Sequence, residues 1–418
     1  MINRINTCKK WYFNQSPYFI FLPFLLIYIA FIFLRGNSSA VVFDEGRYIQ
    51  YAQNLLSGFY SPPFPDIDLW NGPGYPLFLS PFIALDAPLL ILRMSNAFLF
   101  YFALVFIFKA ICIYRAGKVP YAACFLLALY YPCYNIFLYA HTESLAFFLI
   151  SLFAFFFLKS IQCRMWLSRH LVSAAIILAA LAMVKVIFGY VIVVLFFLLL
   201  IFRTNTSFKE VRKKSLSLLI ISFLLCMPYL LYTYRLTNRP FYWTNSSGMS
   251  LYTMSTPFPE EYGDWESTEE LRANPNHSRF IDSLDQLSPI EKDDAYKIQA
   301  INNIKNNPAK YIVNIGANLS RMFFRVPETG DAPPKPSLLI LFPSIILFAC
   351  IFISLFKSVA TFKWLSYDMR VLLLFFLIYL CGSLLVSTYS RMLYITLPFW
   401  TLFISCSLPQ PVVTKRKN

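Results

Sequence analysis

Repeated apolar runs constrain this chain more than any other feature of its sequence. A helix that crosses roughly 30 Å of hydrocarbon needs about 20 mostly apolar residues, and about ten runs meet that rule. They lie near residues 17–34, 89–112, 119–138, 143–160, 169–186, 188–202, 215–234, 337–356, 370–386 and 391–408. Only 14% of the 418 residues are charged, whereas soluble domains contain about 25%. The sequence therefore predicts an all-α polytopic membrane protein built around a bundle of about ten transmembrane helices.

The basic residues indicate how the chain is oriented. A net charge of +15 can accompany nucleic-acid binding, but here the lysines and arginines form short clusters between the apolar runs, as membrane topology requires. The clusters lie at residues 4–10, 109–118, 159–169, 203–214, 357–370 and 415–417. The positive-inside rule places these segments and both termini in the cytoplasm. We therefore expect the lipid bilayer as a partner and no nucleic acid.

Two longer segments then fall on the opposite side of the membrane. Residues 1–234 form a predicted N-terminal transmembrane module that includes a first outer loop, 35–88. Residues 235–336 form a predicted small α-rich cap, and residues 337–418 supply the C-terminal transmembrane helices. The two outer segments contain no cysteine, so we expect no disulfides there. An uncleaved first span and a disulfide-free outer domain favour a bacterial inner membrane.

The most informative polar residues of the first outer loop are an adjacent pair of acids near its start. Asp44 and Glu45 open an amphipathic stretch directly after the first span, where a helix would use them as an N-cap and a first-turn acid or leave them for chemistry. Residues 72–76 read Gly-Pro-Gly-Tyr-Pro, a rigid return toward the bilayer. Asp66 and Asp68 form a D-x-D triplet, but nucleotide sugars are confined to the cytoplasm, so we assign it no metal. No Cys/His cluster has metal-ligand spacing.

Five further polar residues lie at the ends of apolar runs, where each charge needs an explanation. By topology all of them open on the same outer interface as Asp44. Any one alone is equally a helix-end charge that snorkels to water. Together they suit a substrate with a phosphate head and a lipid tail. They are Arg93, His141, Glu143, Lys185 and Arg391.

These residues resemble the GT-C superfamily of membrane glycosyltransferases, in particular the group of lipid A aminoarabinose transferase and the protein O-mannosyltransferases. The similarity lies in the Asp44-Glu45 pair, the return at residues 72–76, Lys185 after a short span, and Ser-Arg-Met-Leu-Tyr at residues 390–394. His-Thr-Glu-Ser-Leu at residues 141–145 is similar to a stretch of mannosyltransferases in the wider superfamily.

The resemblance implies a sugar donor linked to polyprenyl phosphate and an acceptor glycan, glycolipid or protein on the extracytoplasmic face. Asp44, with Glu45 beside it, is then the catalytic base in an inverting transfer, and we expect burial and Glu45 to raise its pKa. The remaining candidates bind substrate. Lys185, Arg391 and Arg93 would hold the lipid phosphate, and Glu143, His141 and Tyr75 would contact sugar or acceptor. The sequence indicates no definite cofactor, and a role for a divalent cation stays open.

Two other classes of membrane protein remain as alternatives. An O-antigen polymerase or ligase has a similar number of spans but would place its key Arg and His residues in the large outer loop. A transporter or flippase for lipid-linked sugars would show internal repeats and charges near mid-bilayer. We expect the cap at residues 235–336 to select the acceptor.

Overall fold

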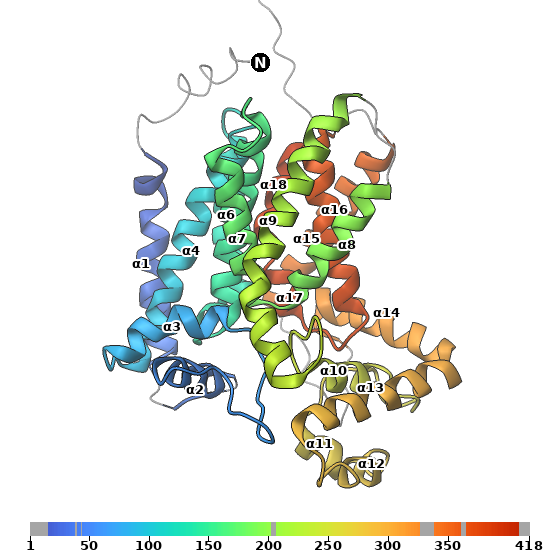
Figure 1. Cartoon of the computed structure of the whole chain (residues 1–418). Coiled ribbons are helices and arrows are strands. Elements are labelled where there is room, and N and C mark those ends of the chain that lie inside the picture. Colours follow the sequence, from blue (N-terminus) through green and yellow to red (C-terminus); the bar gives the residue numbers. More distant parts are fainter. Residues whose placement is uncertain are drawn as a thin grey trace, which may run out of the picture.

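The computed structural model describes residues 16–37, 40–42, 44–201, 206–326, 338–360 and 365–408. Every regular element in those ranges is a helix, and none is a strand. The longer helices stand side by side as an upright bundle (Figure 1). They are α1 (Pro17–Arg35), α4 (Leu89–Ile111), α6 (Thr142–Gln162), α7 (Arg169–Val184), α8 (Ile187–Ile201), α9 (Thr206–Thr237), α15 (Leu338–Ala360) and α16 (Tyr367–Leu384).

The bundle has the length and apolarity of a membrane protein. Within the described ranges, six helices are long and apolar enough to cross a membrane, namely α1, α4, α6, α9, α15 and α16. Shorter apolar helices accompany them, including α7 and α8. The core of the bundle is close-packed around α7, whose buried small residues Ala174, Ala175 and Ala182 allow near approach of α6 and α9. The all-α polytopic membrane architecture predicted from the sequence is confirmed.

One predicted span, residues 119–138, is broken rather than continuous. It forms α5 (Val119–Ala128) and the 3₁₀ helix η3 (Tyr131–Phe137). The Ala128 carbonyl at the end of α5 accepts hydrogen bonds from the Tyr28 hydroxyl at 2.6 Å and the Tyr134 hydroxyl at 2.8 Å. Pro132 lies in η3 and has no N–H to continue an α-helical ladder. The prediction of one continuous span at residues 119–138 is therefore wrong, because a short α-helix is followed there by a 3₁₀ helix.

The last predicted span, residues 391–408, is broken in the same way. It forms α17 (Ser390–Tyr394) and α18 (Leu397–Ser407). Pro398 occupies the first turn of α18, where a missing N–H costs nothing, and the Thr396 hydroxyl donates to the Leu393 carbonyl at 2.6 Å. Arg391 consequently sits on a short separate helix instead of at the start of a long one.

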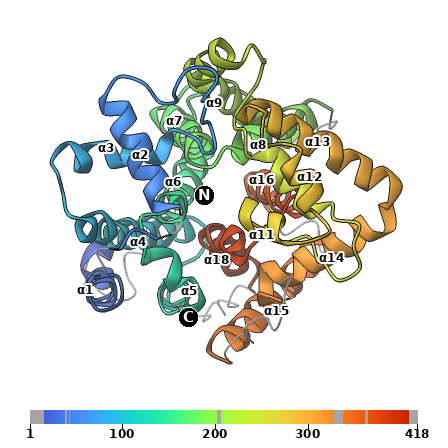
Figure 2. The same ribbon diagram turned by 90° about the horizontal axis from the view of Figure 1, so that it is seen from below.

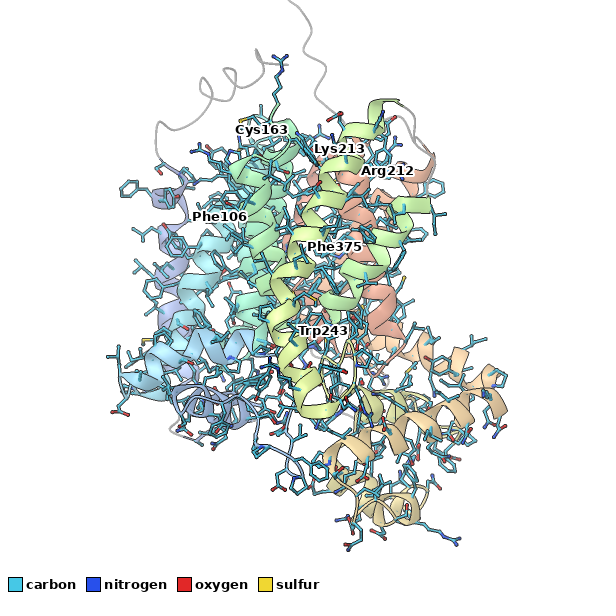
Figure 3. All side chains as sticks on the ribbon, in the orientation of Figure 1. Phe106, Cys163, Arg212, Lys213, Trp243 and Phe375 are labelled. Atoms are coloured by element: carbon cyan, nitrogen blue, oxygen red, sulfur yellow. The ribbon has the colours of Figure 1, made fainter. Side chains whose placement is uncertain are left out.

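The two predicted outer segments gather at one end of the bundle (Figure 1). Seen from that end, α2 and α3 lie on one side and α11–α14 on the other (Figure 2). Arg212 and Lys213, from a predicted cytoplasmic cluster, lie at the opposite end, while Trp243 lies toward the cap (Figure 3). The helices of this end are α2 (Glu45–Leu56), α3 (Gly74–Ala84), α10 (Ser247–Met254), α11 (Thr268–Ala273), α12 (Ser278–Asp282), α13 (Pro289–Asn306) and α14 (Pro308–Phe324).

The Gly-Pro-Gly turn before α3 packs directly on the end of α7. A Cβ atom on Gly72 would lie 2.2 Å from the Met183 carbonyl oxygen, and one on Gly74 would lie 2.6 Å from the Val184 nitrogen. Both neighbours are backbone atoms, which cannot swing aside as a side chain can. The absence of a Cβ therefore lets the turn pack against the last residues of α7, directly before Lys185.

Replacing Gly72 with alanine tests this contact. We expect Gly72→Ala to destabilise the protein by about 1–3 kcal/mol, because the new methyl group overpacks against fixed backbone. Gly316 in α14 has no atom within 4 Å of its would-be Cβ, so Gly316→Ala should be neutral or stabilising by up to about 1 kcal/mol. Thermal unfolding of both variants in detergent gives the comparison. Equal stability of the two would show that the turn does not depend on this close approach.

Candidate active site at the cap end of the bundle

Asp44 stands at the N-terminus of α2 without capping it. Its side chain makes no hydrogen bond to the first-turn amides. The two carboxylate oxygens instead face arginines: Oδ1 lies 3.3 Å from Arg47 Nη1, and Oδ2 lies 3.5 Å from Arg391 Nη1. The side chain is 28% exposed. The helix-cap explanation therefore does not account for Asp44, whose carboxylate remains accessible to a substrate.

Glu45 points the other way, into a buried ion pair with Arg93. Glu45 Oε1 accepts from Arg93 Nε at 2.9 Å and Oε2 from Arg93 Nη2 at 2.6 Å, and both side chains are fully buried. The amides of Ala140 and Val42 donate to the same carboxylate at 2.7 and 3.0 Å. Arg93 also donates to the Gly36 carbonyl at 2.8 Å. These bonds join α2 and α4 to the end of α1 and the start of α6.

The charge of Glu45 is stabilised where it lies. Burial alone would raise the pKa of its carboxyl, but the hydrogen bonds from Arg93 and from the Ala140 and Val42 amides outweigh burial and lower that pKa. A carboxylate that already accepts four hydrogen bonds has little capacity left for a substrate. The geometry gives Glu45 and Arg93 a positioning role beside the cluster that contains Asp44.

Glu143, by contrast, belongs to the Asp44 cluster. Its Oε1 lies 2.8 Å from Lys185 Nζ and 3.7 Å from Arg391 Nε. Glu143 is only 2% exposed, Lys185 is 14% exposed and Arg391 is 37% exposed. Arg391 thus bridges the two carboxylates, because its Nη1 faces Asp44. Residues predicted from four separate regions of the sequence meet here.

The cluster has a surplus of positive charge. Arg47, Lys185 and Arg391 bring three cations against the two carboxylates of Asp44 and Glu143. The surplus of one charge lies at the end of apolar helices, where a phosphate group would be attracted most strongly.

Aromatic residues form a wall beside these charges. Tyr75 is fully buried, its ring meets that of Tyr48 edge-on at 5.1 Å, and its hydroxyl has no hydrogen-bond partner among the described residues. His141 also lies beside Tyr48, at 6.5 Å between ring centroids. Burial lowers the pKa of the His141 imidazole, which leaves it neutral at pH 7. The rings of Tyr75, Tyr48 and His141 therefore pack together beside the charged cluster.

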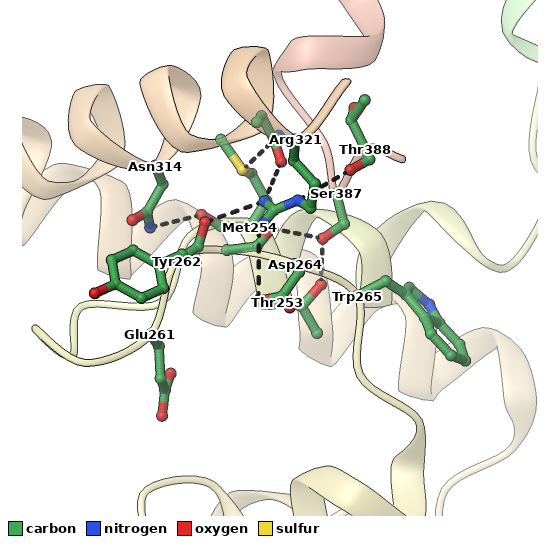
Figure 4. A network of polar contacts seen from close by, with 12 residues as sticks. Thr253, Met254, Glu261, Tyr262, Asp264, Trp265, Asn314, Arg321, Ser387 and Thr388 are labelled. Carbon is green, nitrogen blue, oxygen red and sulfur yellow. Dashed lines mark hydrogen bonds and ion pairs between the residues drawn. The ribbon is translucent and has the colours of Figure 1, made fainter. Parts of the chain in front are cut away.

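Arg391 is positioned through the cap. Arg321, which is buried in α14, donates to the carbonyls of Thr388 at 3.1 Å and Tyr262 at 3.2 Å and lies 3.8 Å from Asp264. Figure 4 shows this network around Arg321, with Ser387 and Thr388 on the segment that leads to α17. The Tyr389 hydroxyl extends it by donating to the Trp265 carbonyl at 2.9 Å. The residues that precede Arg391 are thereby tied to the cap.

Sequence reasoning did not assign Arg47 or Arg321 to the site. Arg47 follows Asp44 by three residues on a helix, a spacing that places the two side chains on one face and could have identified the pair. Arg321 lies in the last turn of the amphipathic helix α14 and carries no comparable signal. Among the described residues, no three His, Cys, Asp or Glu side chains gather as metal ligands.

Comparison with known proteins gives distant structural similarities. No protein-family model and no curated protein sequence matches the chain. The chain is similar to crystal structures of the Archaeoglobus fulgidus oligosaccharyltransferase, at 13% identity and a TM-score of 0.49, both with a tethered acceptor peptide and in the apo form. It is also similar to ArnT from Cupriavidus metallidurans bound to undecaprenyl phosphate, at 13% identity and a TM-score of 0.38.

The coverage of these similarities is uneven. The alignments cover 93% of this chain with the oligosaccharyltransferase and 92% with ArnT. This chain spans about half the length of the oligosaccharyltransferase chains, 49% in one structure and 50% in the other, and 77% of ArnT. These matches compare only the path of the backbone. The functional proposal therefore rests on the side chains of the site itself.

The Glu45–Arg93 pair can be tested by a double-mutant cycle. Glu45→Gln and Arg93→Gln should each lower the free energy of unfolding by about 3–5 kcal/mol, since each leaves a buried charge without its partner. The double variant should lose less than the sum, because the two losses share one interaction. Additive losses would show that the two residues act independently.

The same pair predicts a dependence of stability on pH. Because the folded-state pKa of Glu45 lies below its usual value of 4.5, the pair contributes fully above that pH and its contribution is lost as the pH falls through the folded-state pKa. The stability difference between wild type and Glu45→Gln should therefore shrink on acidification below pH 4.5. A difference that stays constant would contradict a charged Glu45.

Proposed function

We propose that the protein is an integral membrane glycosyltransferase that moves a sugar from a polyprenyl-phosphate donor to an acceptor hydroxyl at the extracytoplasmic membrane surface. The observation that carries this proposal is the placement of Asp44. Its uncapped, partly exposed carboxylate lies next to Arg391, which shares the Glu143 carboxylate with Lys185, at the end of a bundle of apolar helices. A base and phosphate-binding cations are thus adjacent where a lipid-linked phosphate would arrive.

The reaction needs one base and no general acid. The acceptor hydroxyl attacks the anomeric carbon while Asp44 takes its proton, and the bond between that carbon and the phosphate oxygen breaks. The electron pair of that bond leaves with the lipid phosphate, which is a stable anion and needs no proton. Attack from the side opposite the phosphate inverts the configuration at the anomeric carbon.

Lys185 and Arg391 stabilise the charge that builds on the departing phosphate. Glu143 holds both cations, at 2.8 Å and 3.7 Å, so they are oriented before the substrate binds. The donor phosphate and Asp44 also compete for the same Arg391 guanidinium. Binding of the donor would therefore free Asp44 Oδ2 when it is needed to take the proton, while Oδ1 keeps its ion pair with Arg47.

The aromatic wall fits the sugar side of this reaction. The Tyr75 hydroxyl, which no described residue satisfies, and the neutral His141 suit hydroxyl groups of the donor sugar or acceptor. We take the acceptor to be an envelope glycan or glycolipid ahead of a protein, reached on the extracytoplasmic side of an inner membrane with both termini cytoplasmic.

The polymerase or ligase alternative receives less support from the cap. That reading needs Arg and His residues presented by the large outer segment. The single histidine of that segment, His277, is instead buried, with its Nδ1 2.7 Å from the Tyr252 hydroxyl and its Nε2 2.9 Å from Glu261. Exposed arginines such as Arg272 therefore have no exposed histidine to act with in this segment.

Substitution of the base is the first test. Asp44→Asn should reduce transfer from labelled polyprenyl-phosphate sugars by about 10²–10⁴-fold, while asparagine at a helix N-terminus keeps the fold stable. Asp66→Asn, an exposed acid of the same loop, is the matched control and should transfer at the wild-type rate. Assays with EDTA and with added Mg²⁺ address the divalent cation. Wild-type turnover by purified Asp44→Asn would remove Asp44 from the chemistry.

The phosphate-binding cations have a separate signature. Lys185→Gln should raise the KM for the donor by about tenfold or more and lower kcat by up to about 10²–10³-fold, because the cation acts on the phosphate in both ground and transition states. Arg169→Gln removes an exposed cation from the opposite end of the same helix, α7, and should change neither value. An effect confined to the KM for the acceptor would assign Lys185 to the other substrate.

A further inference from the structure

A cavity lies between the first outer loop and the cap, apart from the charges around Asp44. Its volume is about 180 Å³, larger than the engineered cavity of about 150 Å³ that accommodates benzene. Its wall includes Asp68 and Trp70 from the loop and Asn245, Lys292 and Tyr296 from the cap. A space of this size takes a single six-membered ring.

The cavity is held open by hydrogen bonds between the loop and the cap. The Asn245 amide donates to the Leu69 carbonyl at 3.2 Å, and Asn245 Nδ2 donates to the Ile67 carbonyl at 3.3 Å. The hydroxyls of Thr244 and Ser246 both donate to the Trp70 carbonyl, at 2.7 and 2.9 Å. The walls are therefore fixed relative to one another before any ligand arrives.

Two polar side chains on the wall, Asn245 and Lys292, have hydrogen-bonding groups that no described residue uses fully. Asn245 is 5% exposed, and its Oδ1 accepts no hydrogen bond from any described residue. Lys292 lines the cavity and forms no ion pair in the part of the chain that the structure describes. A buried amide oxygen without a donor costs free energy unless a ligand supplies one. The pair therefore calls for a ligand that both donates and accepts hydrogen bonds.

The remaining wall residues are aromatic, otherwise apolar or already committed to other contacts, as Arg272 is to Asp285. Trp70 and Tyr296 contribute rings, which suit the apolar faces of a saturated ring bearing hydroxyls. Asp68 Oδ1 accepts from the Tyr51 hydroxyl at 2.5 Å and from the Trp70 amide at 3.2 Å, so this carboxylate oxygen is fixed at the wall. Aromatic faces beside a few placed polar groups are the composition of a small-molecule site.

The cavity is linked to the proposed base by a short chain of contacts. The Arg47 guanidinium lies 5.2 Å from the centre of the Trp70 ring, and Arg47 forms the ion pair with Asp44. Arg47 Nη1 also lies 3.5 Å from Asn71 Oδ1, one residue beyond Trp70. A ligand that touches Trp70 is thus separated from Asp44 by one arginine.

We propose that this cavity binds one sugar ring of the acceptor, with Asn245 Oδ1 accepting from a ring hydroxyl, Lys292 donating to a ring substituent and Trp70 covering one face. The assignment to the acceptor, rather than to another glycan, rests on the proposed transferase function. The binding of a sugar ring does not depend on that function. The site would hold the acceptor glycan while its reacting hydroxyl reaches Asp44.

Direct binding of simple sugars tests the proposal. Purified protein in nanodiscs, without alkyl-glycoside detergent, is titrated with methyl glycosides of neutral hexoses, a hexosamine and a hexuronic acid, and saturation-transfer NMR reports contact. We expect at least one glycoside to bind with a Kd of about 1 mM or tighter. Asn245→Ala and Lys292→Gln should each weaken binding by about tenfold or more. Lys292→Gln removes a side chain without an ion pair and keeps the test valid if Asn245→Ala misfolds.

Matched controls use exposed residues of α13. Asn302→Ala and Lys305→Gln change the same residue types outside the cavity and should bind like wild type. Asp44→Asn should lose transfer yet keep sugar binding, so failure of the proposed base and failure of this site give different results. No saturable binding of any glycoside by wild type, or equal binding by Asn245→Ala and Lys292→Gln, would overturn the proposal.

Discussion

The buried ion pair between Glu45 and Arg93 is the interaction on which the proposed catalytic centre depends. A broken ion pair in a low-dielectric interior leaves an uncompensated charge. Separating α2 from α4 would break this pair and would therefore cost a large free energy. Its hydrogen bonds also reach Gly36 and Ala140. Asp44 is the neighbour of the anchored residue. It can therefore stay uncapped and partly exposed, because Glu45 supplies the attachment that the helix end would otherwise need.

The sequence could predict four of the residues that share the site, because topology alone brings the ends of alternate apolar runs to one side, but it did not identify Arg47. Asp44, Glu143, Lys185 and Arg391 meet as that reasoning requires. It could not predict which acid pairs with which cation, since that choice depends on side-chain packing between segments far apart in the chain. Arg93 is the example: it was expected near the phosphate and is held by Glu45. The side of the membrane on which the site opens stays a prediction.

The helix breaks show a second limit of sequence reasoning. Pro132 and Pro398 are visible in the sequence, yet the apolar runs around them are long enough to read as continuous spans. At the break, residues 129–130, the Ala128 carbonyl accepts hydrogen bonds from the hydroxyls of Tyr28 in α1 and Tyr134 in η3. The apolar pattern of the run does not predict these bonds. The cap is similar, because Asn245 contacts a loop more than 170 positions earlier. The cap also contacts the neighbours of both arginines that face Asp44. Arg321 of the cap donates to Thr388, three residues before Arg391. Thr244 and Ser246 of the cap donate to Trp70, whose ring lies against Arg47.

The anomeric configuration of the transferred sugar tests the central claim most directly. Purified protein would be given a polyprenyl-phosphate sugar of known configuration and a crude envelope glycolipid acceptor, and the new glycosidic bond would be analysed by NMR. A single base at Asp44 and direct attack on the anomeric carbon predict a product of opposite configuration to the donor. A product with the same configuration would contradict the one-base mechanism, and a complete absence of transfer across a panel of such donors would contradict the proposed function.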